Sequence, residues 1–210
     1  MKLICFDCDS TLSSIEGIDE LARIRGPEVL ARVAALTRDA MDGRIPIEDV
    51  FGLRLDAIRP SREDVAAVGM RYVENVEPTA LETVCRMLGL GWTPVIISGG
   101  FRQAIRPLAE YLGIERIEAV ELFFGPDGSY RDYDRTYPST RSGGKREIII
   151  RLRAEFQPEK VVMVGDGASD LETSPSVDLF VGFGGFVARE RLKSASSAFV
   201  TSLASVPALV

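Results

Sequence analysis

The sequence predicts an α/β fold built on a doubly wound parallel sheet with helices on both faces. Short apolar runs recur along the chain, and each is followed at once by Asp, Ser or Gly. Helical patterns lie between the later runs. Apolar strands that alternate with helices are typical of parallel sheets buried on both faces. A block of helical patterns after the first run breaks the alternation and predicts an insertion.

Four apolar runs predict the strands of the sheet. They cover residues 2–6, 94–97, 161–164 and 179–181. Asp7, Ser98, Gly165 and Gly182 follow them directly. Ligands of such sheets bind beyond the carboxyl ends of the strands. The residues after each run are therefore the candidates for a functional site.

Helical spacing of apolar residues predicts three helices between the strands. The first is marked by Leu81, Val84, Cys85 and Leu88 and ends at Gly89. The others run over 101–112 and from about Lys145 to Phe156. A small β-hairpin is also expected, because 119–124 and 129–133 flank the turn residues Gly125-Pro126-Asp127-Gly128.

Residues 14–75 contain four helical patterns and no convincing strand. The patterns begin near Ile15, at Pro27, at Pro46 and after Ser61. Proline is favourable at a first helical position, and Ser61 with Asp64 is close to a capping box. We expect this block to form a helical cap inserted after the first strand, with 1–13 and 76–210 as the α/β core.

Composition argues against several classes of protein. The chain has 25 basic and 31 acidic residues, a net charge of −6, which gives no basic field for nucleic acid or an anionic membrane. No apolar run reaches the roughly 18 residues of a membrane span. Three cysteines without metal-ligand spacing indicate a reduced, cytoplasmic setting. The absence of histidine excludes Ser-His and Cys-His catalysis and His-ligated zinc.

Carboxylates follow two of the predicted strands. The period of a strand places Asp7 and Asp9 on one side of the chain and Cys8 on the other. Neighbouring carboxylates repel unless a cation neutralises them or one is protonated. The first case suits Mg²⁺ and the second a general acid. Asp166 and Asp170 could complete an acidic metal site; the alternative for both segments is an ordinary turn after a strand.

Two glycine-containing segments could bind phosphate. Ser98-Gly99-Gly100 precedes a helix, whose free N–H groups would suit an anion, although a simple Gly-rich turn is the alternative. Lys145 follows Ser142-Gly143-Gly144 and opens another helix. It is not a P-loop lysine, because Ser139 stands where that loop needs Gly and Arg146 where it needs Ser or Thr.

Arg54 lies on the apolar face of the third predicted helix in the insertion. That face is marked by Ile47, Val50, Phe51, Leu55 and Ile58. An arginine on an apolar face needs an anionic partner. The partner is either a substrate carboxylate or an acidic residue within the cap.

Together these segments resemble the haloacid dehalogenase (HAD) superfamily of phosphatases. Its four motifs match Asp7-Cys8-Asp9-Ser10-Thr11, Ser98-Gly99-Gly100, Lys145 and Gly165-Asp166-Gly167-Ala168-Ser169-Asp170 in order. Within it, the chain resembles the phosphoserine phosphatase family nearly end to end, most specifically in the first motif and in Glu16-Gly17-Ile18-Asp19-Glu20-Leu21-Ala22. The resemblance implies a Rossmann-like core and Mg²⁺-dependent hydrolysis of O-phospho-L-serine, the last step of serine biosynthesis.

The resemblance also implies a role for each matching residue. Asp7 would be the nucleophile that forms an aspartyl-phosphate, and Asp9 the acid for the leaving serine oxygen and then the base for water. Lys145 is grouped with these catalytic residues. The implied Mg²⁺ ligands are Asp7, the Asp9 carbonyl and Asp166, with Asp170 in support. The implied substrate contacts are Ser98, Gly99, Gly100 and Lys145 for phosphate, Glu16 for the ammonium and Arg54 for the carboxylate, with Met41 and Ser169 lining the site.

We therefore expect a cytoplasmic monomer or homodimer whose partner is a small phosphomonoester, not nucleic acid or membrane. Two other functions share the chemistry. A phosphotransferase would pass the phosphoryl group to another hydroxyl, such as that of homoserine. A signalling receiver also carries a phosphorylated aspartate, but Asp9 and the cap argue against it, because a receiver does not need fast turnover.

Overall fold

The computed structural model describes the chain except for residues 42–44 and 46, and it describes no side chain for residues 40, 41 and 47. Six strands of the described chain form one parallel sheet in the order β3-β2-β1-β6-β7-β8. Their bounds are Lys2–Phe6 for β1, Trp92–Phe101 for β2, Arg116–Val120 for β3, Lys160–Gly165 for β6, Leu179–Phe183 for β7 and Ala198–Val200 for β8. The order runs outward from β1 in both directions, which confirms the doubly wound fold.

The central strand β1 is buried on both faces of the sheet. Ile4 and Phe6 belong to the larger core cluster, which includes residues of α5 (Ala80–Gly89) and α6 (Arg102–Leu112). Leu3 and Cys5 point to the opposite face, into a second cluster with α7 (Gly144–Phe156). Alternate residues of one apolar strand thus fill two separate cores, as expected of a strand inside a parallel sheet.

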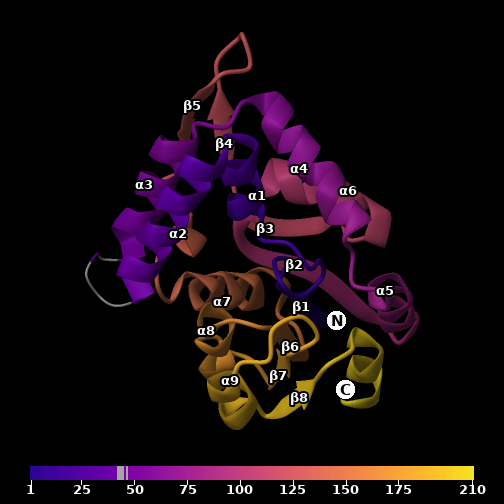
Figure 1. Ribbon diagram of the computed structural model, residues 1–210. Coiled ribbons are helices and arrows are strands. Elements are labelled where there is room, and N and C mark those ends of the chain that lie inside the picture. The colour runs from indigo at the N-terminus through magenta and orange to yellow at the C-terminus, as the bar shows by residue number, and fades with distance from the viewer. Residues whose placement is uncertain (42–44, 46) are drawn as a thin grey trace.

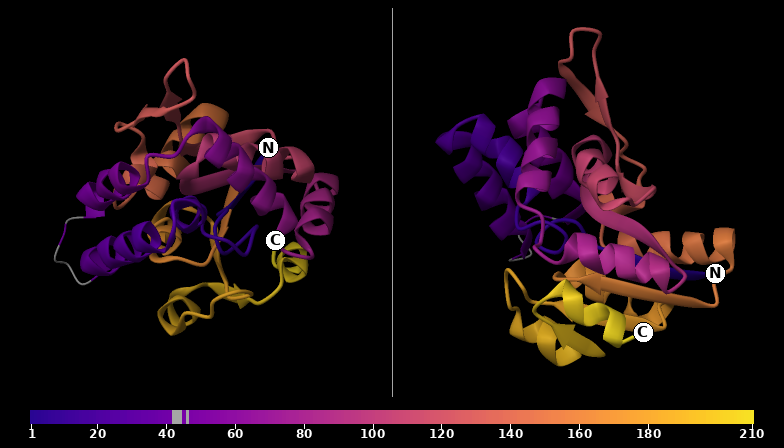
Figure 2. Two further views of the ribbon diagram at one scale, coloured as in Figure 1. Left: turned by 45° about the horizontal axis from the view of Figure 1, so that its top comes forward. Right: turned by 90° about the vertical axis from the view of Figure 1, so that its right-hand side faces the viewer.

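Four helices inserted after β1 lie above the carboxyl edge of the sheet (Figures 1 and 2). They are α1 (Gly17–Ile24), α2 (Pro27–Met41), α3 (Ile47–Ile58) and α4 (Arg62–Glu74). The capping box predicted at Ser61 and Asp64 is present at the start of α4. Figure 1 shows α4 beside the core helix α6, and a Cβ atom at Gly69 would lie only 3.0 Å from Pro107 Cγ. The absence of a side chain at Gly69 therefore permits this close helix packing.

The insertion leaves and rejoins the core at neighbouring points. The Ser14 N–H donates to the Asn75 carbonyl at 2.9 Å, and the Glu77 N–H donates to the Leu12 carbonyl at 2.8 Å. Ser13 and Val76 also form an isolated antiparallel bridge. The two chain segments that connect insertion and core are thereby hydrogen-bonded to each other.

The predicted hairpin is confirmed as β4 (Leu122–Phe124) and β5 (Tyr130–Tyr133), which project above the rest of the molecule (Figure 1). Its predicted first arm was too long, because residues 119 and 120 belong to β3. Strands β3 and β8 were not predicted. The short helices α8 (Ala168–Leu171) and α9 (Glu190–Ala195) precede β7 and β8.

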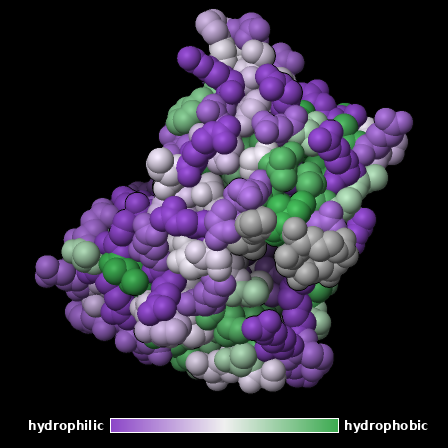
Figure 3. Space-filling model, turned by 90° about the vertical axis from the view of Figure 1, so that its left-hand side faces the viewer, coloured by the Kyte–Doolittle hydropathy of each residue, from purple (hydrophilic) through white to green (hydrophobic). Residues whose placement is uncertain are grey.

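The side of the molecule that carries α2 and α3 is mostly hydrophilic, with a limited apolar area (Figure 3). No helix within the described residues is long and apolar enough to cross a membrane.

Candidate active site

A cavity of about 250 Å³ opens between the carboxyl edge of the sheet and the inserted helices. It collects predicted site residues from segments far apart in the sequence. They are Asp7, Asp9, Glu16, Arg54, Ser98, Gly99, Gly100, Lys145, Asp166 and Ser169. Asp170 contacts this group through Lys145. The side chain of Met41 lies outside the described residues.

Asp7 and Asp9 both line the cavity, although strand alternation is not the reason. Strand β1 ends at Phe6 and is followed by a tight turn, in which the Cys8 carbonyl accepts hydrogen bonds from the N–H groups of Leu12 and Ser13. Cys8 packs in the core. The turn, rather than the period of a strand, sends the two carboxylates to the same side.

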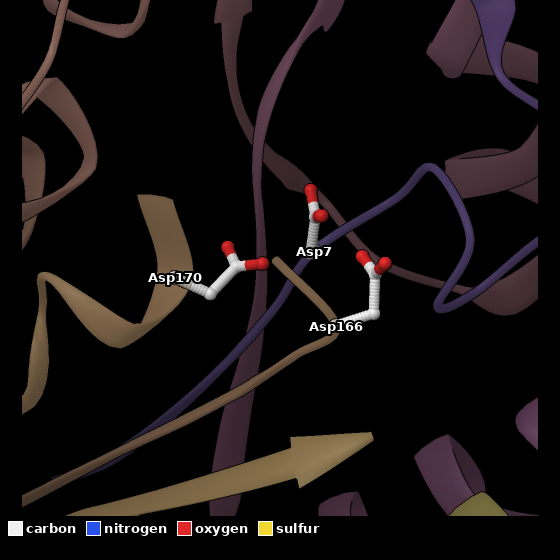
Figure 4. Close-up of side chains that lie close together, drawn as sticks. All are labelled: Asp7, Asp166 and Asp170. Carbon is white, nitrogen blue, oxygen red and sulfur yellow. The ribbon is translucent and has the colours of Figure 1, made fainter. Parts of the chain in front are cut away.

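Three aspartates converge from separate segments (Figure 4). Asp7 follows β1, Asp166 follows β6 and Asp170 lies in α8. One carboxylate oxygen from each lies within 4.8 Å of the others, and all three residues are buried. The Gly167 N–H donates to Asp170 Oδ2 at 2.9 Å and holds that carboxylate in place.

Lys145 balances part of this negative charge. Its Nζ lies 2.7 Å from Asp7 Oδ1 and 2.6 Å from Asp170 Oδ1. Burial alone would lower the pKa of Lys145, but the charges of Asp170 and Asp7 raise it, so the ammonium stays charged. The Cys8 N–H also donates to Asp7 Oδ1, at 2.8 Å. Lys145 and the Cys8 N–H thus both contact Oδ1 of Asp7. Within the described chain, Oδ2 is therefore the oxygen that is available to a ligand.

Backbone geometry places Lys145 at the start of α7. Gly143, the residue before the helix, has a φ of 72°, which favours glycine. At Gly144 an added Cβ would overlap the Pro138 carbonyl, so only glycine fits there. The Ser142-Gly143-Gly144 segment therefore allows the helix to begin directly against the cavity.

The acidic cluster fits a hard divalent cation. Its donors are carboxylate oxygens alone, which are the ligands that Mg²⁺ and Ca²⁺ prefer. Burial, followed by the charge of Asp170, raises the pKa of Asp7 well above its usual value. The same two causes raise the pKa of Asp166 to about 6, although Arg189 acts in the opposite direction. A bound cation would relieve this repulsion.

Asp9 has a different environment from the cluster. Its Oδ1 accepts a hydrogen bond from the Tyr72 hydroxyl. Burial, followed by the charge of Glu16, raises the pKa of Asp9 to about 7, while the Tyr72 hydrogen bond acts to lower it. A carboxyl group that titrates near neutral pH can both give and take a proton, as a general acid–base must.

Glu16 and Arg54 bring opposite charges to the cavity from the inserted segment. Glu16 directly precedes α1, and its Oε1 accepts a hydrogen bond from Ser10 Oγ at 2.6 Å. Arg54 lies on α3 with its guanidinium 5.9 Å from the centre of the Phe51 ring. Its Nε is buried and has no hydrogen-bond partner among the described residues. Burial lowers the pKa of Arg54, which reflects the cost of holding that charge away from water.

The glycine segment at the end of β2 also lines the cavity. The strand continues through Ser98-Gly99-Gly100 to Phe101, and its register against β3 shifts at this point. Ser98 is buried, and its Oγ accepts the Gly100 N–H at 2.9 Å. The segment is an irregular strand end, and the predicted glycine turn is replaced by this bulge.

Several cavity residues were not predicted. Arg189 donates from Nη2 to Asp166 Oδ2 at 3.2 Å. Arg141 and Ser139 line the cavity as well, and Ser139 Oγ is a buried atom without a partner in the described structure. Arg189 follows β7, so the rule that sites form beyond the carboxyl ends of strands could have identified it. Tyr72, near the C-terminal end of α4, has no feature in the sequence that predicts a role at the site.

The fold and the acidic site define a class of enzyme. A family model for the haloacid dehalogenase-like hydrolases matches residues 1–176, and the chain belongs to this family. The phosphoserine phosphatase of Rattus norvegicus is 39% identical over 200 residues, which cover 94% of this chain and 88% of the relative. Within the hydrolases, the chain is a member of the phosphoserine phosphatase family.

Solved structures agree with this placement. A phosphoserine phosphohydrolase-like protein from Francisella tularensis subsp. tularensis SCHU S4 matches with a TM-score of 0.86 and 26% identity, covering 100% of both chains. A phospho-aspartyl intermediate analogue of phosphoserine phosphatase matches with a TM-score of 0.82 and 27% identity, covering 100% of this chain and 98% of that one.

Proposed function

We propose that the protein hydrolyses O-phospho-L-serine to L-serine and phosphate with the help of Mg²⁺. One observation carries the proposal: a single cavity joins an acidic cluster with Lys145 to a second pair of opposite charges, Glu16 and Arg54. The cluster suits a metal-assisted phosphomonoester reaction. The pair suits the ammonium and carboxylate of an amino acid. The rat relative, which is a phosphoserine phosphatase, supports the same substrate.

In the first half of the proposed reaction, Asp7 attacks the substrate. Its Oδ2 forms a bond to phosphorus while the bond from phosphorus to the serine oxygen breaks. Asp9 gives its proton to that oxygen, and serine leaves. The pKa of Asp9 near 7 suits this donation. The phospho-aspartyl intermediate analogue of a related phosphatase supports a covalent aspartyl-phosphate intermediate.

In the second half, water replaces serine. Asp9, now ionised, takes a proton from water as the oxygen of that water attacks phosphorus. The bond from phosphorus to Asp7 breaks, which releases inorganic phosphate and restores the Asp7 carboxylate. The proton gained from water regenerates the acid form of Asp9, so the cycle closes.

Charge stabilisation is the main task of the other groups. Asp7, Asp166 and the Asp9 carbonyl would hold Mg²⁺, with Asp170 in support, and the ion would neutralise charge on the phosphoryl oxygens. Lys145, with Ser98, Gly99 and Gly100, would bind the same oxygens. Lys145 also favours the ionised form of Asp7, because its charge opposes the rise in the pKa of that carboxyl that burial and Asp170 cause.

The insertion provides substrate recognition in this proposal. Glu16 binds the ammonium of serine and Arg54 its carboxylate. The Nε of Arg54 is buried without a hydrogen-bond partner among the described residues, which supports an anionic ligand there. Ser169 lines the cavity, and the lining role of Met41 stays a prediction, because its side chain lies outside the described residues. We assign residues 14–75 to a cap that excludes bulk water, and residues 1–13 and 76–210 to the core that performs the chemistry.

A phosphate-release assay tests the proposal directly. Purified protein is offered a panel of phosphomonoesters with Mg²⁺ and with excess chelator. We expect phosphoserine to be the best substrate and chelator to abolish turnover. Adding homoserine separates hydrolysis from phosphotransfer, because phosphohomoserine would then accumulate in place of phosphate. Equal activity on all substrates would show that the protein is a phosphatase without a preference for phosphoserine.

A further inference from the structure

Tyr72 is tied at both ends to the loop that carries Asp9. Its side chain is fully buried, and its hydroxyl donates to Asp9 Oδ1. Its backbone carbonyl accepts a hydrogen bond from Ser13 Oγ at 3.1 Å, four residues further along the same loop. Asp9 and Ser13 are themselves paired by a β-bridge. The helix α4 is thus connected to this loop through one residue.

The surroundings leave the Tyr72 hydroxyl little freedom. A Cβ atom added at Gly17 would overlap the hydroxyl oxygen and lie 3.0 Å from the ring carbon Cζ. A Cβ added at Gly100 would lie 3.5 Å from the same oxygen. Gly17 therefore leaves the space in which the hydroxyl meets Asp9, and Gly100 borders that space. Burial raises the pKa of Tyr72 well above its usual value, so the hydroxyl remains a donor at neutral pH.

We propose that Tyr72 is a positioning residue, which holds Oδ1 of Asp9 and thereby keeps the other carboxyl oxygen directed at the leaving group of the substrate. The inference rests on the proposed function, in which Asp9 is the general acid–base. A carboxyl held at one oxygen cannot rotate freely about its Cβ–Cγ bond, and proton transfer requires its other oxygen within hydrogen-bond reach of the substrate.

The competing interpretation is purely structural. Buried tyrosines usually find a hydrogen-bond partner, and Asp9 could simply serve as that partner. The two interpretations differ in which kinetic constant changes. A structural role would weaken folding or disturb binding and chemistry alike, whereas a positioning role changes the chemical step alone.

Tyr72→Phe keeps the ring and removes only the hydroxyl. We expect kcat for phosphoserine to fall about ten- to a hundredfold, with KM unchanged within about twofold. Tyr130→Phe is the matched control, because the Tyr130 hydroxyl is buried without a hydrogen-bond partner in the described chain. That variant should keep the wild-type kcat.

The leaving group supplies a second measurement. An aryl ester such as 4-nitrophenyl phosphate releases a stable anion and needs little help from an acid. For this substrate, kcat/KM of Tyr72→Phe should fall less than about threefold, as should that of Asp9→Asn. An equal loss on both esters would favour a structural role and overturn the proposal.

Gly17→Ala tests the same contact from the opposite side. Its Cβ should displace the Tyr72 hydroxyl and lower kcat in the same way. In the double variant Gly17→Ala/Tyr72→Phe the losses should not add, because the displaced group is already absent. Fully additive losses would contradict the proposal.

The outcomes separate this inference from the proposed function. Loss of kcat in Asp9→Asn together with wild-type kcat in Tyr72→Phe would overturn positioning by Tyr72 alone. Wild-type kcat in Asp9→Asn, or no cleavage of phosphoserine by the wild type, would overturn the proposed function itself.

Discussion

Lys145 Nζ lies 2.7 Å from Asp7 Oδ1, and both side chains are buried. The ammonium lies equally close to Asp170, at 2.6 Å. One buried cation therefore faces two buried carboxylates before any metal is counted. Removing it leaves two buried carboxylates without their cation.

Lys145→Met should lower the free energy of unfolding of the metal-free protein by about 3–5 kcal/mol at pH 8. The loss should shrink toward pH 5. The pKa of Asp7 is already raised, and it rises further without the lysine, so protons neutralise the carboxylate as the pH falls. Urea unfolding with chelator at both pH values measures this. Lys193→Met, on exposed α9, is the control and should change little; an equal loss at both pH values would contradict the explanation.

Asp7→Asn should abolish phosphate release and leave the fold unchanged, because the amide is isosteric but cannot act as the nucleophile. Turnover is measured with phosphoserine, and the fold by circular dichroism. Substantial activity in a correctly folded variant would exclude Asp7 as the attacking group.

Asp9→Asn should reduce kcat by about 10²–10⁴, the range expected when a general acid–base is removed. The amide oxygen can still accept the Tyr72 hydrogen bond, so packing is preserved. Rapid-quench measurement would locate the loss in phosphorylation and dephosphorylation of Asp7. A change below about threefold would assign the proton transfers to another group.

Metal affinity should weaken as the pH falls below about 6. The pKa of Asp166 is raised to about 6, so below that pH the cation must displace a proton, and each displaced proton costs up to about tenfold in apparent Kd per pH unit. Calorimetric titration of Mg²⁺ between pH 5 and 8 measures this dependence. Asp166→Asn should lose most of the affinity, while Asp127→Asn, in the exposed hairpin, should titrate like the wild type. A Kd that does not change with pH would contradict the raised pKa of Asp166, and wild-type affinity in Asp166→Asn would exclude it as a ligand.

Arg54→Ala should remove most of the preference for phosphoserine over phosphoethanolamine, which lacks the carboxylate. The wild-type preference should be roughly 2–5 kcal/mol in kcat/KM, because the guanidinium, whose Nε is buried, lacks its anionic partner when no carboxylate binds. Discrimination against 3-phospholactate, which lacks the ammonium, should persist because Glu16 is unchanged. Arg59→Ala, an exposed arginine after the same helix, is the control. If the wild type cleaves all three esters equally well, Arg54 does not read the carboxylate.

The site residues at the carboxyl ends of β1, β2 and β6 could be predicted because of a general property of parallel sheets. All carboxyl ends lie at one edge, so Asp7, Ser98 and Asp166 must converge wherever these strands pair. The family resemblance predicted that Lys145 lies at the same site. Its contact with Asp7 is possible because the two glycines before it allow the helix to begin beside the cavity.

The sequence was less informative about elements whose structure depends on tertiary packing and not on the local pattern of apolar residues. Strand β3 contains Glu118, and a carboxylate within a short apolar run argues against a buried strand. The structure pairs this carboxylate with Arg116, two residues earlier in the same strand, at 2.6 Å, and with the Tyr137 hydroxyl, a contact that only the tertiary fold creates. Tyr72 was missed for a related reason, because an aromatic residue on the buried face of a helix gives no indication that its hydroxyl reaches a site.

The hydrogen bonds between residues 12–14 and residues 75–77 hold the two ends of the inserted segment together, so that the segment could be exchanged as a unit. Because the two ends of the insertion already lie side by side, a longer, shorter or unrelated segment can be accommodated there at a small entropic cost and without altering the sheet. Substrate preference can therefore diverge by exchange of one contiguous segment, while the phosphoryl-transfer groups stay in place. Any replacement would also have to supply its own partner for Asp9, since Tyr72 leaves with the segment that it belongs to.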